Sequence, residues 1–181
     1  MVMLSGLVLF GCADGPSHLI IAPEINTPTT IQYHNKHAYF KVTDLRTAAH
    51  IIQIQQGGEA AKLMTSQELL SDVINQTLKS EFAKQGLILD QSGLNHIDII
   101  IDTALIKVMQ ETMSYEAKSN ISLRVKVKNN QQTLTKTFNS QSSSSGPLSA
   151  DIAVLERDFN QQLTNALINI LNNKEIIQFI K

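Results

Sequence analysis

Residues 96–109 read HIDIIIDTALIKVM, and this stretch decides how the rest of the chain is interpreted. Apolar residues recur here at every second position, which is the period of a β-strand that buries one face. The intervening positions are partly apolar as well, so the strand is expected at the centre of a sheet. One face is predicted to carry Ile97, Ile99, Ile101 and Leu105, and the other Ile100, Ala104, Ile106 and Val108.

Two amphipathic helices lie on either side of this strand in the sequence. An apolar stripe predicts the first helix at 66–85. Thr65 and Glu68 have the spacing of a capping box, and Gly86 stands where a C-cap is needed. A second stripe predicts a helix at about 150–171. Each helix has a single apolar face, so both are expected to pack against a sheet.

Shorter patterns predict four further strands, at 37–45, near 51–54, at 121–128 and at 131–139. Asn129 and Asn130 are expected to form the two-residue turn of a hairpin, because Asn tolerates positive φ. The polar run at 140–147 is interpreted as a connection. The element order ββ-α-βββ-α predicts an α+β fold, in which a mixed, largely antiparallel sheet carries two packed helices.

The chain ends in an apolar segment, which contains Ile176, Ile177, Phe179 and Ile180. Frayed termini are seldom this apolar, so these side chains are expected to be covered. Docking onto the chain's own domain is the favoured interpretation, and a partner surface is the alternative.

The composition indicates a globular domain. Hydrophobic residues make up 43% of the 181 residues, which is enough for a core. Lys and Arg total 15 and Asp and Glu total 16, so the net charge is −1 and no nucleic-acid partner is expected. The single cysteine excludes an internal disulfide framework and a cysteine-rich zinc site.

The N-terminal stretch MVMLSGLVLFG carries no charge. It is too short to cross a bilayer as a helix, but it suits the apolar region of a secretory signal. Cys12 follows directly, with Leu9 and Gly11 before it, and this arrangement resembles the lipobox of bacterial lipoproteins. The resemblance implies cleavage between Gly11 and Cys12 and acylation of Cys12, which anchors the chain in a membrane. The alternative is a buried N-terminal strand with an incidental free cysteine.

The lipobox resemblance also implies a domain organisation. Residues 1–11 are the expected signal peptide, residues 12–30 the lipidated N-terminus with a flexible tether, and residues 31–181 one globular domain. Because Ala13 rather than Asp follows Cys12, the sorting rule of these lipoproteins implies the outer membrane, with the domain in the periplasm.

One pair of charged side chains is a candidate site. Asp44 and Arg46 leave the predicted strand at 37–45, and a bidentate contact between them is expected to order the next loop. A structural role is favoured, since ion pairs at strand ends are common. A ligand or partner site at that sheet edge is the alternative.

Other side chains that could carry chemistry are poorly placed for it. His34 and His37 have HxxH spacing, but residues three apart on a strand point to opposite faces, so no metal site is predicted. Asp98 and Asp102 would lie ~13 Å apart on a strand, too far for a shared metal or a glycosidase pair. They are expected either to face solvent on one face of the sheet or to pair with Arg124 or Lys126 of the next strand. No catalytic residue and no cofactor are predicted.

Over residues 9–181 the chain resembles the YajG family of bacterial outer-membrane lipoproteins. The resemblance rests on the lipobox, the segment VTDLR at 42–46, the capped helix, the hairpin and the closing EIIQFIK. It implies a lipid-anchored protein that faces the periplasm, and the family offers no catalytic residues to transfer. We therefore expect a non-enzymatic binding module, or an accessory to envelope assembly or transport, with an envelope protein as partner. The alternative is an envelope hydrolase with an unrecognised active site, which a pocket of convergent titratable groups would favour.

Overall fold

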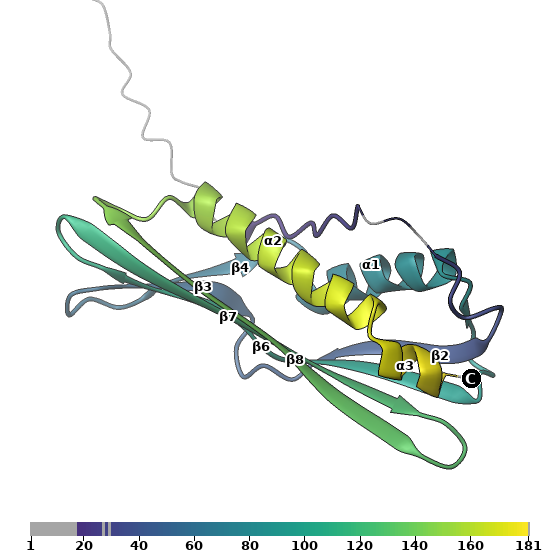
Figure 1. The fold of residues 1–181 in the computed structure, drawn as a ribbon. Coiled ribbons are helices and arrows are strands. Elements are labelled where there is room, and N and C mark those ends of the chain that lie inside the picture. The colour runs from purple at the N-terminus through teal and green to yellow at the C-terminus, as the bar shows by residue number, and fades with distance from the viewer. Residues whose placement is uncertain (1–17, 27, 29, 181) are drawn as a thin grey trace, which may run out of the picture.

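In the computed structural model, which describes residues 18–26, 28 and 30–180, an eight-stranded sheet carries its helices on one face (Figure 1). The strands are β1 (His18–Leu19), β2 (His37–Asp44), β3 (His50–Gln56), β4 (Lys62–Ser66), β5 (Ile88–Leu89), β6 (Asn95–Gln110), β7 (Ser114–Lys128) and β8 (Thr133–Pro147). The helices are α1 (Leu70–Lys84), α2 (Ile152–Leu171) and α3 (Lys174–Phe179). This architecture confirms the predicted α+β class, and the short elements β1, β4, β5 and α3 add to the predicted order.

The strand β6 is the centre of the sheet, as its sequence predicts. Along one edge it pairs antiparallel with β7 over its whole length, and β7 pairs in turn with β8. Along the other edge it pairs in parallel with two strands placed end to end. Residues 38–44 of β2 face 95–101, and residues 52–56 of β3 face 106–110. β2 and β6 are parallel, and the chain between them passes through α1. The succession of strand, helix and strand in the sequence predicts such a crossover connection.

A bulge in β6 changes which side chains enter the core. The pairing with β7 shifts register between Ile101 and Thr103, and one extra residue reverses the alternation of faces beyond that point. Ala104 and Ile106 are therefore buried, and Leu105 lies on the other face. The prediction that Leu105 shares a face with Ile101 is wrong, because strict alternation does not allow for a bulge.

The first helix begins later than its sequence predicts. Thr65 and Ser66 belong to β4, where they pair with β3 and β1, so Thr65 does not cap the helix. The residue at the N-cap is Leu69, which makes no side-chain capping bond. The capping-box spacing is misleading here, because the alternating segment KLMTS forms a strand that pairs with β3.

The C-terminus of α1 has the predicted glycine cap. Gly86 has a φ of +83°, a conformation that glycine adopts without steric cost. The Leu87 N–H donates to the Phe82 carbonyl at 3.0 Å, and the Gly86 N–H donates to the Ala83 carbonyl at 3.0 Å. These two bonds are the Schellman motif, and they turn the chain toward β5.

The hairpin of β7 and β8 differs from the prediction at both ends: its loop is longer, and its strands extend further at the open end. Lys128 pairs with Thr133, so the loop has four residues rather than two. The Asn129 side chain accepts the backbone N–H groups of Gln131 and Gln132, which closes the loop without positive φ. At the other end, the polar run at 140–147 continues β8 and is not a connection, because β7 begins at Ser114 and offers it partners.

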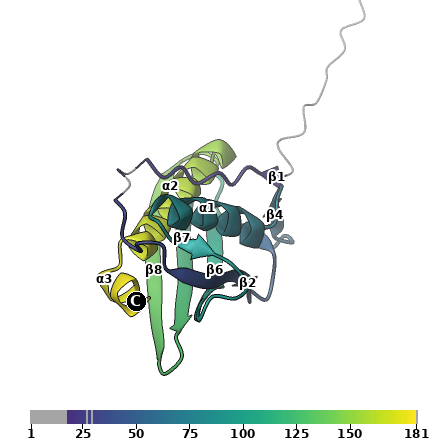
Figure 2. The same cartoon turned by 90° about the vertical axis from the view of Figure 1, so that its right-hand side faces the viewer.

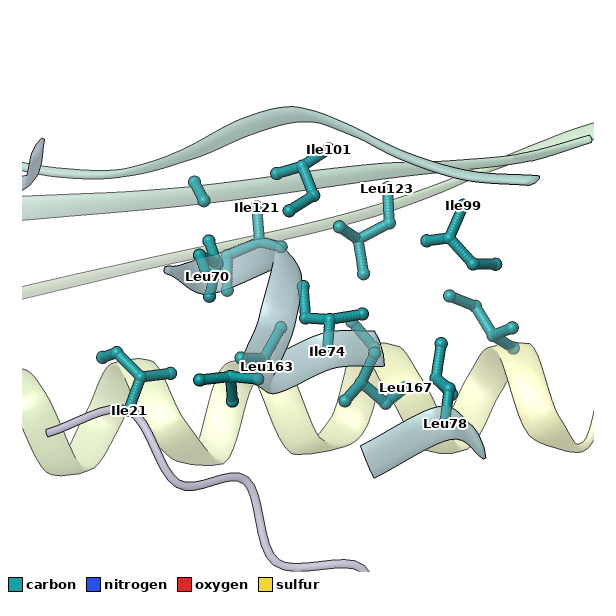
Figure 3. Packing of buried hydrophobic residues seen from close by; sticks show 14 of the residues in the cluster. Ile21, Leu70, Ile74, Leu78, Ile99, Ile101, Ile121, Leu123, Leu163 and Leu167 are labelled. Carbon is teal, nitrogen blue, oxygen red and sulfur yellow. The ribbon is translucent and has the colours of Figure 1, made fainter. Parts of the chain in front are cut away.

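The core lies between the helices and one face of the sheet. Figure 3 shows side chains from both layers meeting there, with α2 beneath β6 and β7 and α1 beside them. Its labelled members are Ile21, Leu70, Ile74, Leu78, Ile99, Ile101, Ile121, Leu123, Leu163 and Leu167, all buried.

The described N-terminal residues pack on the domain, which differs from the predicted flexible tether at 12–30. Leu19 and Ile21 are buried in the core. The Ile20 N–H donates to the Glu156 carboxylate at 2.7 Å, and the Ala22 N–H donates to the Asn160 side chain at 2.9 Å. The segment thus crosses over the helices as part of the fold (Figure 2).

The C-terminal segment docks on the chain's own domain, as the favoured interpretation predicted. Ile176 and Ile180 are buried, and Ile177 and Phe179 pack partly against the core. Glu175 of α3 forms an ion pair with Lys136 of β8, which places α3 beside the sheet (Figure 1).

Candidate functional site

The predicted pair Asp44 and Arg46 lies where β2 ends and β3 has not yet begun. The Arg46 guanidinium donates to both carboxylate oxygens of Asp44, at 2.7 to 3.1 Å, and the Arg46 backbone N–H donates to the same carboxylate at 3.0 Å. Its remaining terminal nitrogen donates to the carbonyls of Ala104 at 3.2 Å and His50 at 3.4 Å. Arg46 therefore bridges the gap between two strands that share one edge of β6.

The electrostatics of this joint favour the paired state. The Arg46 side chain is only 7% exposed and that of Asp44 28% exposed. Partial burial alone would raise the pKa of Asp44, but the hydrogen bonds and the positive charge of Arg46 outweigh it and hold the pKa below its ordinary value. A cavity of about 200 Å³ lies beside Arg46 at this joint. The contacts of Asp44 and Arg46 are those of a pair with a structural role, which joins β2 to β3.

The two aspartates of β6 also form ion pairs with basic neighbours. Asp102, at the bulge, accepts from Arg124 of β7 at 2.5 Å. Asp98 lies 3.8 Å from Lys41 of β2, on the opposite edge from the basic residue expected on β7. Both carboxylates thus belong to cross-strand pairs on the open face of the sheet.

The HxxH pair is divided between a turn and a strand. His34 has a φ of +47° in the turn before β2, and His37 is the first residue of β2. The His37 ring contacts the Asp90 carboxylate at 2.5 Å, and this hydrogen bond, with burial opposing it, holds the pKa of Asp90 below its ordinary value. Within the described part of the chain no three histidine, cysteine or acidic side chains gather as metal ligands would.

A groove that the sequence does not predict lies between α2 and the second half of β8. Its volume is about 370 Å³, and its walls include Leu155, Phe159, Ser142 and Ser144. The groove exists because the sheet presents serines, and not large side chains, to this part of α2. The groove is not predicted because the serine run is interpreted from the sequence as a connection, whereas it belongs to β8.

The buried polar side chain Gln162 forms one wall of this groove. Its carbonyl accepts the Ser119 hydroxyl at 2.5 Å and the Ser142 hydroxyl at 3.4 Å, and its amide donates to the Ser140 carbonyl at 2.7 Å. Gln162 follows Phe159 by three residues and so lies on the apolar stripe of α2. A single amide side chain on this apolar stripe is the feature of the sequence that could have predicted a polar contact between α2 and the sheet.

The outer edge of β8 beside the groove is a second feature of the site. Among the described strands β8 pairs only with β7, so its other edge has no strand partner. Residues 141–145 are all exposed, and we call this segment the serine edge. It contains one glutamine and four serines, with no charge and no proline.

Comparison of the sequence with protein-family models shows the family of this chain. A family model described as uncharacterized lipoprotein matches residues 23–181. This chain belongs to that lipoprotein family. Membership confirms the lipoprotein part of the resemblance found in the sequence. A comparison with curated proteins finds none that matches this chain.

Three solved structures share the fold of this lipoprotein family member. A Xanthomonas campestris protein of the DUF330 family has a TM-score of 0.63 at 15% identity, over 88% of this chain and 96% of its own. An uncharacterized protein has a TM-score of 0.52 at 12% identity, over 81% and 95%. A homolog of a neuraminyllactose-binding hemagglutinin from Helicobacter pylori has a TM-score of 0.50 at 9% identity, over 90% and 96%. At these identities the likeness concerns the fold alone.

The predicted anchor residues Gly11 and Cys12 lie outside the described residues. Among the helices that are described, none is both long enough and apolar enough to span a bilayer.

Proposed function

We propose that this protein is anchored through acylated Cys12 to the periplasmic face of the outer membrane, where it is a non-catalytic binding module for an envelope protein. An extended segment of the partner adds as a strand to the serine edge of β8. The observation that carries this proposal is an unpaired strand edge directly beside an open groove.

The serine edge has the chemistry that strand addition needs. An edge strand offers backbone N–H and C=O groups to an incoming strand. Proteins usually protect such edges with charged side chains, prolines or bulges. Residues 141–145 have neither charge nor proline, and the pairing of β8 with β7 runs through them without a bulge.

The groove supplies specificity to an edge that would otherwise accept any strand. In strand addition, backbone hydrogen bonds provide affinity and pockets for alternate side chains provide specificity. Side chains of Ser142 and Ser144 face the groove, whose far wall holds Leu155 and Phe159. The partner segment is therefore expected to alternate, with apolar side chains entering the groove beneath α2 and polar ones facing solvent.

A photocrosslinking experiment in the native host tests the proposal. A photoreactive phenylalanine replaces Gln141 on the serine edge or, as the control, Gln76, which is exposed on α1. We expect one envelope protein to be joined at position 141 and not at 76. Ser144→Leu, which fills the groove, should abolish the adduct at 141. Equal adducts at both positions, no adduct at 141, or an adduct that persists in Ser144→Leu would contradict strand addition.

The anchor is tested separately by intact mass. The chain purified from its own envelope should begin at Cys12 and carry acyl chains, whereas Cys12→Ala should remain uncleaved or lose its attachment. Fractionation of inner and outer membranes then tests the location. A mature chain without lipid would refute the anchor.

A further inference from the structure

Three large apolar side chains are exposed together at one end of the sheet. Met109 is the last residue but one of β6, Met113 lies in the turn between β6 and β7, and Leu148 follows β8; they are 55%, 68% and 60% exposed. The Leu148 N–H donates to the Met113 carbonyl at 2.9 Å, so these segments are in contact. We call Met109, Met113 and Leu148 the apolar tip.

The backbone holds Leu148 at this tip in a strained conformation. Its φ is +63°, which is rare for a large side chain. Two hydrogen bonds fix it there: its N–H donates to Met113, and its carbonyl accepts the Gln110 side-chain amide at 2.8 Å. Such strain persists only where surrounding contacts enforce it, and strained residues are concentrated at functional sites. Here it presents a leucine to the exterior.

The direction of the strands shows at which end the N-terminal segment enters the domain. β6 runs toward the apolar tip, and β3, parallel to it, does so too. β4 is antiparallel to β3 and runs away from the tip, and β1 is parallel to β4. The chain therefore enters β1 from the side of the tip.

The length of chain before β1 matches the distance to the tip. His18 is level with Thr65 and hence with His50, and Gln56 is level with Gln110 at the tip. From residue 50 to residue 56 a strand extends ~20 Å. From Cys12 to His18 the chain can likewise span at most ~20 Å. Cys12 can therefore reach the plane of the apolar tip, and it cannot pass far beyond.

We infer that the apolar tip is a second membrane contact, which rests on the bilayer that holds the acylated Cys12. The inference depends on the anchor in the proposed function. Glu111 and Glu116 flank the tip, and Glu116 pairs with Lys118 at 2.8 Å. The contact is therefore apolar, with the methionines and Leu148 among the lipid headgroups and upper acyl chains, and it needs no anionic lipid.

Lipid quenching of a single fluorophore tests this orientation. Met113→Cys provides the only free thiol in a chain whose Cys12 is acylated, and an environment-sensitive dye is attached there. Leu94→Cys is the matched control: Leu94 is 67% exposed and directly precedes β6, at the far end of this 16-residue strand. The acylated protein is reconstituted into phosphatidylcholine vesicles that contain lipids brominated on their acyl chains.

We expect a blue shift and strong quenching of the dye at position 113, and neither at 94. Both should persist at high salt, because the contact is not ionic. Equal quenching at the two positions, or none at 113, on protein whose mass shows acyl chains would overturn this inference alone. Protein that carries no acyl chain would overturn the proposed anchor and this inference with it.

Discussion

At the scale of single residues, Arg46 has the largest structural role that sequence analysis identified. It supplies hydrogen bonds to two carbonyls and one carboxylate at a joint where one edge of β6, between β2 and β3, has no strand partner. Hydrogen bonds to a charged, buried group contribute more to stability than neutral or exposed ones.

Arg46→Ala should therefore lower the free energy of unfolding by about 2–3 kcal/mol. Urea denaturation measures the change. Lys41→Ala is the control, because Lys41 is half exposed and 3.8 Å from Asp98, and its loss should cost less than ~1 kcal/mol. Similar costs for the two variants would show that Arg46 does not hold the joint.

The pKa of Asp44 gives the joint a pH dependence. Because the pKa is lower in the folded chain than in the unfolded one, ionised Asp44 stabilises the fold above its ordinary pKa, and this contribution is lost as the pH falls through the folded value. The difference in unfolding free energy between the native chain and Asp44→Asn should thus shrink on acidification below about pH 4. Urea midpoints at several pH values measure it, and a constant difference would contradict the assignment.

At the scale of elements, the cap of α1 illustrates how a turn depends on one glycine. A Cβ at Gly86 would meet the strain of a φ of +83° and lie 3.2 Å from the Ile31 side chain. Gly86→Ala should lower the unfolding free energy by about 1–2 kcal/mol. In Gly58→Ala, where a Cβ meets nothing within 4 Å and φ is not positive, stability should stay the same or rise slightly. Thermal unfolding of the two variants makes the comparison.

The same scale shows where sequence reasoning succeeded and where it did not. The central strand, both long helices and the Gly86 cap were predictable, because each follows from a local period or a backbone requirement. The serine run of β8 was not, since serine has no apolar period and its strand depends on pairing with β7. The groove was equally hidden, because it arises from small side chains in one element opposite large ones in another. The pair Asp44 and Arg46 was predictable as a contact, but not as the bridge between β2 and β3.

At the scale of the whole molecule, both ends of the described chain are docked on the domain. Ile176 and Ile180 are buried, and burial of each such side chain contributes ~1.5–3 kcal/mol. Removal of residues 175–181 should therefore cost about 3–6 kcal/mol of a stability that is typically 5–15 kcal/mol. Glu175→Ala, which removes only the exposed ion pair with Lys136, should cost less than ~1 kcal/mol. An unchanged urea midpoint after truncation would show that α3 does not stabilise the fold.

The parallel pairing of β1 with β4 has a mechanical consequence for a chain held at its N-terminus. A pull on the residues before His18, directed toward the apolar tip, acts along the axis of β1. It loads the hydrogen bonds to β4 together with those from Ile20 and Ala22 to α2, side by side and at the same moment. Bonds loaded in shear share the force, whereas bonds that are peeled apart fail one after another. A protein tethered between a membrane and a partner would thus resist tension at the point where its fold begins.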